Sequence, residues 1–299
     1  MDILKLRALV ELSRLGTMTE VARVTGYGTS AVSQQLASLE RQAGVPLLET
    51  SGRRVRLTPA GRRLAERGRD ILAALTAAEL DLSARAEPHG LVRVAGYTTA
   101  LRSHLLPAVA ELACSHPSVV VELRESEPTE VADLLDRGEI DLGFVYDYTL
   151  VPRAWRHPHA LMSTSTIVLA VPDDAVVPDR LSGPSDLDVF RDTAWIGNSR
   201  DTGDDELAAR LCALAGWIPR VRHRVDSLEL VADLVLAGQG ISVLPADTPE
   251  AHRVRTVALD LARVERRMWT MVRAGTEDWP ATNAVIDHVR AHLATYCLA

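Results

Sequence analysis

Residues 25–40, TGYGTSAVSQQLASLE, place a tight turn directly before an amphipathic helix. The two glycines mark the turn, because glycine tolerates the positive φ that a sharp change of direction requires. The helix is predicted to begin at Thr29 or Ser30 and to bury a narrow stripe of apolar residues. This stripe consists of Val32, Leu36 and Leu39. A short turn followed by such a helix predicts the second half of a helix-turn-helix.

The opposite face of this helix carries short polar side chains instead of the long charged ones that are common on solvated faces. It consists of Ser30, Ser33, Gln34, Ala37 and Ser38. In the major groove of DNA, glutamine pairs with adenine, serine donates or accepts, and alanine contacts the thymine methyl group. The face is therefore predicted to contact base edges, and a merely solvated helix is the alternative.

The neighbouring segments complete a winged helix-turn-helix. Thr17 and Glu20 fit a capping box, which predicts a short helix from about Thr19 to Thr25. Downstream, residues 48–58 (LETSGRRVRLT) predict a β-hairpin with Arg53 and Arg54 beside its turn. Arginines in such a wing are expected to hold phosphates or to enter the minor groove.

A long helix is predicted from Pro59 to about Ala86, because proline fits the first turn and Pro88 and Gly90 end the pattern. Small and apolar residues recur along it in steps of four and three, which is typical of a coiled-coil seam. They are Leu64, Gly68, Ile71, Leu75, Ala78 and Leu82. At 1.5 Å per residue the helix is about 42 Å long, which exceeds most small domains and predicts dimerisation.

From residue 90 onwards, β-rich runs alternate with helical stretches. The runs lie at 91–97, 119–125, 140–146, 166–172, 193–197, 220–225 and 241–245. The helical stretches lie at 101–115, 128–137, 204–215 and 227–237. This alternation predicts a parallel α/β arrangement in two units, and two such units without a catalytic motif predict a two-lobed binding module.

Polar side chains at the carboxyl ends of these strands are candidates for a ligand site, because open α/β sheets bind ligands there. The candidates are Thr98, Thr99, Ser126, Asp147, Tyr148, Asn198, Ser199 and Ser227. Hydroxyl groups before helices suit an anion, although each one alone is also a common helix cap. The acid Asp147 argues against a purely anionic ligand.

The charge of the 299-residue chain is unevenly distributed. Its net charge is −7, but residues 1–70 carry +5 and the remainder carries −12. A basic head on an acidic body indicates nucleic-acid binding by the head. The length and the hydrophobic content of 47% are typical of a globular protein with two or more domains.

Several other classes of protein are not indicated. The three cysteines show no CxxC spacing, and Cys212 is expected to be a buried structural thiol, with peroxide sensing as the alternative. No nucleotide-binding, hydrolase or zinc-protease motif occurs, so no enzyme, metal or cofactor is predicted, and His157 and His159 are expected in a surface loop. The chain contains neither a signal peptide nor a long apolar run, which predicts a cytoplasmic protein without membrane contact.

Four stretches resemble the LysR-type transcriptional regulators. They are LxALVELxxxGTMTEVA near the start, TSAVSQQLASLERQAGVPLL, RRVRLTPAG and GxGISVLP. The likeness implies a homodimer or homotetramer on double-stranded operator DNA, a small-molecule effector, and contact with RNA polymerase. A small-molecule solute-binding or sensing protein without a DNA function is the alternative.

The resemblance also implies domains and site residues. Expected are a winged helix-turn-helix domain at 1–58, a linker helix at 59–89 and a periplasmic-binding-protein-like α/β effector domain at 90–299. The effector domain divides into subdomain I, at about 90–163 and 267–299, and subdomain II, at about 164–266. The implied DNA-binding residues are Thr29, Ser30, Ser33, Gln34, Arg53 and Arg54. Because the family usually has glutamine at the position of Thr29, no operator sequence follows.

Overall fold

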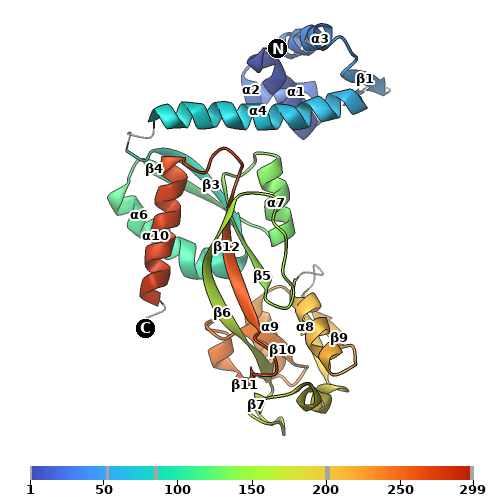
Figure 1. Ribbon diagram of the computed structural model, residues 1–299, viewed down its shortest axis with the longest axis vertical. Helices are drawn as coiled ribbons and strands as arrows, with labels where there is room; N and C mark the ends of the chain where they lie inside the picture. Colours follow the sequence, from blue (N-terminus) through green and yellow to red (C-terminus); the bar gives the residue numbers. More distant parts are fainter. Residues whose placement is uncertain (1, 52–53, 84–86, 199–202, 297–299) are drawn as a thin grey trace.

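The computed structural model describes residues 2–51, 54–83, 87–198 and 203–296 of the chain (Figure 1). A helical head and one long helix lie at one end of the molecule, and an α/β part with two lobes extends away from them.

Three short helices form the head: α1 (Ile3–Leu15), α2 (Met18–Thr25) and α3 (Thr29–Ala43). The Thr17 hydroxyl caps α2 by accepting a hydrogen bond from the N–H of Glu20 at 3.3 Å. Gly26 ends α2 with a φ of 73°, the left-handed conformation that this turn requires. The predicted helix-turn-helix is confirmed.

The apolar stripe of α3 fixes the rotation of this helix. Val32, Leu36 and Leu39 are at most 1% exposed and pack with Leu9 and Leu12 of α1. Burial of each such side chain contributes about 1.5–3 kcal/mol relative to exposure. The residues on the opposite side of α3 therefore face outward.

A two-stranded hairpin follows α3, as predicted for the wing. β1 (Leu48–Ser51) pairs in antiparallel fashion with β2 (Arg54–Leu57). The Glu40 carboxylate of α3 accepts hydrogen bonds from the N–H groups of Leu47 at 2.8 Å and Leu48 at 2.9 Å. These bonds fasten the start of the wing to the end of α3.

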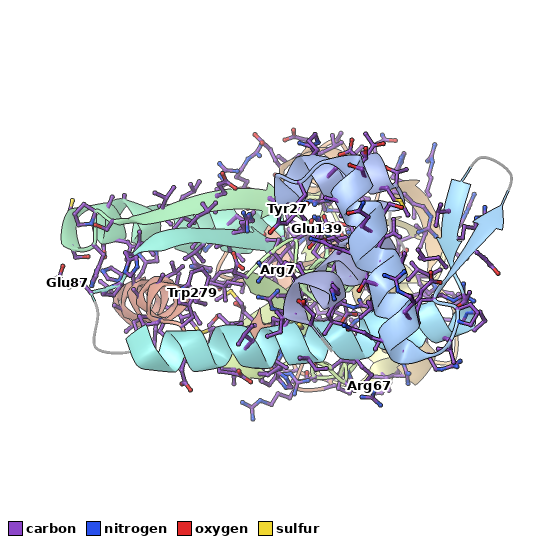
Figure 2. The ribbon with its side chains drawn as sticks, turned by 90° about the horizontal axis from the view of Figure 1, so that it is seen from above. Arg7, Tyr27, Arg67, Glu87, Glu139 and Trp279 are labelled. Atoms are coloured by element: carbon purple, nitrogen blue, oxygen red, sulfur yellow. The ribbon has the colours of Figure 1, made fainter. Side chains whose placement is uncertain are left out.

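The long helix, α4 (Pro59–Ser83), packs the first part of its predicted seam inside the chain. A Cβ at Gly68 would lie 2.9 Å from Leu6 Cδ1 and 3.0 Å from Val10 Cγ2, so Gly68 is in close contact with α1. Ile71 is 46% exposed, and the helix then extends beyond the head (Figures 1 and 2). The prediction that this seam faces a partner chain is therefore wrong at Gly68.

One mixed sheet runs through both lobes in the order β4–β3–β5–β12–β6–β11–β7. In the first lobe, β3 (Gly90–Gly96) lies between β4 (Val119–Glu125) and β5 (Leu142–Tyr148), and all three are parallel. β12 (Glu265–Val272) and β6 (His159–Val171) are antiparallel to their neighbours. The predicted parallel arrangement is confirmed for the runs at 91–97, 119–125 and 140–146 and for the pair at 193–197 and 220–225. It is wrong for the runs at 166–172 and 241–245, which pair with each other in antiparallel fashion.

The composition of β6 explains why its first half is not predicted. Its second half is the apolar run that predicts a strand from residue 166. Its first half pairs with β12 but is interrupted by small polar residues, so no apolar run marks it. β12 mixes charged and apolar residues (ERRMWTMV) and is not marked either.

The second lobe is built around the second half of β6, which pairs with β10 (Ser242–Pro245) and β11 (Arg255–Leu259). The other strands are β7 (Arg180–Leu181), β8 (Ala194–Gly197) and β9 (Arg220–Arg224). The chain crosses between the lobes at Ile167 and at Val264, where the N–H of Ile167 donates to the carbonyl of Val264 at 3.0 Å.

Helices cover the sheet of the first lobe on both faces. α6 and α10 pack on one face and α7 on the other (Figure 1). The described α-helices after residue 90 are α5 (Thr98–Ala100), α6 (Leu106–Ser115), α7 (Pro128–Asp136), α8 (Gly203–Leu214), α9 (Leu228–Leu236) and α10 (Pro280–Tyr296). A π-helical turn (Leu101–Leu105) joins α5 to α6, and two 3-10 helices lie at Pro184–Phe190 and Ala251–Arg253.

Candidate functional sites

The outer face of α3 is a flat polar surface at the end of the head. Thr29, Ser30, Ser33 and Gln34 are exposed. Gly28 is the residue before α3, and no side chain caps the helix there. Short side chains on an exposed helix let a large partner approach the helix closely, as the major groove of DNA requires.

The wing projects from the head beside α4 (Figure 2). Arg56 is exposed and Val55 and Leu57 are half-buried, so side chains alternate along β2 as the sequence predicts. Arg53 lies outside the described residues. Arg54 begins β2, and its side chain also lies outside the described part of the wing.

A cavity of about 440 Å³ lies between the two lobes, at the carboxyl ends of β3, β4 and β5. Of the eight predicted ligand-site residues, five line it: Thr98, Thr99, Tyr148, Asn198 and Ser227. They come from both lobes, and the volume suits a small organic molecule. Ser199 lies outside the described residues.

Two predicted residues do not reach the cavity. Ser126 is 3% exposed, and its hydroxyl donates to the carbonyl of Glu125 at 2.7 Å. Asp147 is 1% exposed and accepts hydrogen bonds from Arg267 Nη2 at 2.6 Å and Trp269 Nε1 at 3.0 Å. Successive side chains of a strand point to opposite faces, so Asp147 points away from the face that presents Tyr148.

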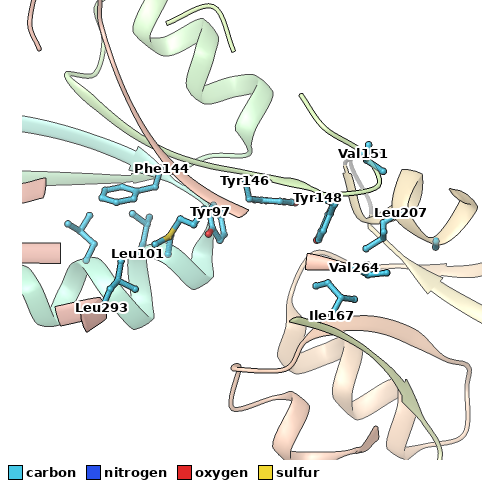
Figure 3. Close-up of a cluster of buried hydrophobic side chains, with 14 of the residues drawn as sticks. Tyr97, Leu101, Phe144, Tyr146, Tyr148, Val151, Ile167, Leu207, Val264 and Leu293 are labelled. Atoms are coloured by element: carbon cyan, nitrogen blue, oxygen red, sulfur yellow. The ribbon is translucent and has the colours of Figure 1, made fainter. Parts of the chain in front are cut away.

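Three tyrosines form a row along the cavity and between the hydrophobic clusters of the two lobes (Figure 3). The ring centroids of Tyr97 and Tyr146 lie 4.7 Å apart, and those of Tyr146 and Tyr148 lie 5.7 Å apart. Burial raises the pKa of Tyr97 to about 12 and raises that of Tyr148 well above its usual value. Both phenols are therefore neutral at pH 7 and keep their protons for hydrogen bonds.

Three carboxylates on the cavity wall accept hydrogen bonds from neighbouring hydroxyl groups. Thr98 Oγ1 donates to Glu125 Oε1 at 2.6 Å. The Tyr146 hydroxyl donates to Glu127 Oε2 at 3.2 Å.

The Tyr148 hydroxyl donates to Asp204 Oδ1 across the boundary between the lobes. Burial raises the pKa of Asp204, against the opposing effects of this hydrogen bond and of Arg266.

Several residues that line the cavity are not predicted from the sequence. Tyr97, Glu125, Tyr146 and Asp226 stand at the predicted strand ends, but none is among the eight candidates. Alternate residues of a strand share a face, so the selection of Tyr148 on β5 also predicts that Tyr146 lies on the cavity side. Arg266 lies on β12, which the sequence reading misses.

His157 and His159 lie away from the cavity. His159 is exposed but begins β6, so the prediction of a surface loop is wrong for this residue. His157 precedes β6, and its Nε2 lies 3.2 Å from Asp136 Oδ1 with the side chain 10% exposed. No group of three or more His, Cys, Asp or Glu side chains suited to a metal ion occurs among the described residues. Cys212 is fully buried, and its burial raises the thiol pKa to about 12.

Family comparisons agree with this architecture. The model for the LysR substrate binding domain matches residues 85–294. The model for the bacterial regulatory helix-turn-helix protein, lysR family, matches residues 3–62. The chain belongs to the LysR family. This LysR regulator therefore combines a DNA-binding head with an effector-binding domain, and the alternative of a solute-binding protein without a DNA function is not supported.

Relatives cover nearly the whole length of this LysR regulator. The transcriptional dual regulator GltC of Bacillus subtilis (strain 168) is 26% identical over 97% of this chain and 96% of its own length. A structure of full-length OxyR from Pseudomonas aeruginosa, in a variant form, has a TM-score of 0.72 at 20% identity, covering 97% of this chain and 98% of that one. Full-length CbnR, solved with its target DNA, has a TM-score of 0.51 at 23% identity, covering 98% and 99%. Among the described residues, no helix is long and apolar enough to cross a membrane.

Proposed function

We propose that this LysR regulator reads operator bases with the outer face of α3 and binds its effector between the two lobes. The proposed reading of bases is supported by the difference in burial between the two faces of α3. Val32, Leu36 and Leu39 are fully buried, whereas Ser33 and Gln34 on the other side are exposed. A recognition helix needs such a pair of faces, one for the core and one for the groove.

The proposed DNA contacts are of two kinds, those with base edges and those with phosphates. Ser30, Ser33 and Gln34 contact base edges in the major groove, and Thr29 lies at the tip of the helix, where the groove is entered. Arg53 and Arg54 of the wing hold phosphates and set the register on double-stranded DNA.

The effector contacts come from both lobes. Thr98, Thr99 and Tyr148 belong to subdomain I, at about 90–163 and 267–299, and Asn198 and Ser227 belong to subdomain II, at about 164–266. Ser199 is kept because it follows Asn198, whereas Ser126 and Asp147 are left out because they lie away from the cavity. An effector couples to DNA only if it binds two states of the assembly unequally, and a site shared by two lobes provides this difference.

The exposed end of α4 is the proposed contact between two copies of the chain. Ile71 lies about one turn after Gly68 on α4 and is 46% exposed. A homodimer presents two α3 helices to half-sites about 34–36 Å apart, and a homotetramer presents four. Ile71→Glu is expected to shift the sedimentation coefficient toward the monomer, and an unchanged value would place the contact elsewhere.

A gel-shift titration of the full chain on the DNA that flanks its own gene tests the proposal. Affinity is expected to fall steeply as the salt concentration rises from about 50 to 200 mM, because arginine–phosphate contacts release counterions. Binding that ignores salt, or no binding to this DNA, would contradict the proposed role of the head.

A further inference from the structure

The charge of the cavity between the lobes is strongly negative. Among the described residues that line it, six are carboxylates and two are guanidinium groups. A site with this balance repels anions and favours cations.

Three of these carboxylates already have neutral hydroxyl donors. Glu125, Glu127 and Asp204 accept from Thr98, Tyr146 and Tyr148 respectively, and two of the three donors are phenols. A neutral donor orients a carboxylate without cancelling its charge. A carboxylate has about four acceptor positions, which is more than one hydroxyl donor fills.

The wall between the carboxylates is aromatic. Tyr97, Tyr146 and Tyr148 lie in a row with centroid separations of 4.7 and 5.7 Å (Figure 3). The guanidinium carbon of Arg266 lies 5.4 Å from the Tyr97 centroid, so one cation already sits against this row. Tyrosine faces attract cations, and the attraction is greatest where water is excluded.

From these contacts we propose that the effector is a cationic amine. Its ammonium group lies against the tyrosine row and donates hydrogen bonds to Glu125 and to Asp204, which line the cavity from the two lobes. Such a ligand bridges the lobes by charge, whereas a carboxylate in the same place meets a lining of six carboxylates and two guanidinium groups, of which Arg102 pairs with Glu250 at 3.8 Å. This inference rests on the proposed function of the cavity as the effector site.

Three series of compounds with matching carbon chains but different net charges test the class of ligand. Diamines, ω-amino acids and dicarboxylates of three to six carbons are added to the full chain, and the melting temperature is measured. A diamine at ten times its Kd is expected to raise the melting temperature by about 3 °C or more. The ω-amino acid is expected to act more weakly, and the dicarboxylate not at all.

Two variants distinguish diamine binding in the cavity from nonspecific attraction of a diamine to an acidic protein. Glu125→Gln keeps the size of the side chain and is expected to weaken diamine binding by about tenfold, because a charged hydrogen-bond partner is lost. Asp173→Asn removes an equal charge from an exposed position outside the cavity and is expected to leave binding unchanged. Each melting shift is taken relative to the same variant without ligand, so a less stable variant remains informative.

The outcomes are distinct. A dicarboxylate that acts as strongly as the diamine overturns the cationic class and leaves the cavity as the effector site. Diamine binding that Glu125→Gln does not weaken overturns the cavity contacts, as does a series in which no diamine shifts the melting temperature. DNA binding is measured by gel shift on the same preparations, so failure of the head is seen separately.

Discussion

The outer face of α3 and the cavity between the lobes, which are the two proposed recognition sites, are differently built surfaces. The α3 face belongs to one helix of 15 residues, and its orientation is fixed by three buried side chains. The cavity combines segments from Tyr97 to Arg266, and no single element forms it. Substitutions in α3 alone should therefore abolish DNA binding, whereas effector binding should change with substitutions at many positions that are distant in the sequence.

The strongest test of this comparison is the inner stripe of α3. Leu36→Ala is expected to lower the free energy of unfolding of the head by about 2–5 kcal/mol, because it leaves a cavity at a buried position. Urea unfolding followed by circular dichroism measures the change. Ser33→Ala on the exposed face is the matched control and should stay within about 0.5 kcal/mol. Equal losses in both variants would mean that the two faces of α3 are not distinct.

Acid sensitivity is expected in the first lobe, which contains His104. Burial is the main cause that lowers the pKa of His104 to about 4, so the folded lobe keeps this ring neutral. Between pH 6.5 and 4 the unfolded chain binds a proton that the folded chain does not. The free energy of unfolding should therefore fall by up to about 3 kcal/mol as the pH falls through this window.

Unfolding titrations from about pH 4 to 7 measure this loss in two histidine variants. His104→Gln should flatten the pH dependence, and His252→Gln, at an exposed position, should keep it. If His104→Gln loses stability with falling pH as steeply as the unchanged protein, another group causes the effect.

The outer face of α3 is tested by its glutamine. Gln34→Ala is expected to cost about 1–3 kcal/mol of binding free energy on the cognate operator and little on random DNA, because a bidentate base contact is lost. Gln42→Ala, on the last turn of the same helix, is the control. Equal losses on both DNAs would show that Gln34 contacts phosphates and does not read bases.

The smallest effect is expected from peroxide. A thiol with a pKa near 12 is almost entirely protonated at pH 7, and Cys212 is fully buried. Hydrogen peroxide should therefore change operator affinity by less than about twofold through Cys212, and a thiol reagent should label the exposed Cys114 before Cys212. A larger change that Cys212→Ser abolishes would make this thiol a sensor.

These two regions also differ in how far the sequence predicts them. The α3 face depends on spacings of three and four residues, so Val32, Leu36 and Leu39 identify both the buried side and the exposed side. The cavity depends on pairing between distant strands. Thr98 and Ser227 are found because strand ends meet at one edge, but β12 has no apolar run, so Arg266 is missed.

Asp147 illustrates a second limit of sequence reasoning. Its position at the end of β5 is predicted, but the side of the sheet that it faces depends on which neighbours cover each face. Its partners, Arg267 and Trp269, belong to the strand that sequence reasoning misses. Without β12, an ion pair of the fold cannot be distinguished from a ligand contact.

The two crossings between the lobes, at Ile167 and Val264, have a mechanical consequence. They are adjacent backbones joined by a hydrogen bond of 3.0 Å, so they act as one narrow hinge. Rotation about this hinge changes the spacing between Tyr148 and Asp204, whose hydrogen bond spans the gap. The lobes then behave as two lever arms, and a small closure around the effector becomes a larger displacement at the far end of the first lobe, where α4 lies (Figure 1).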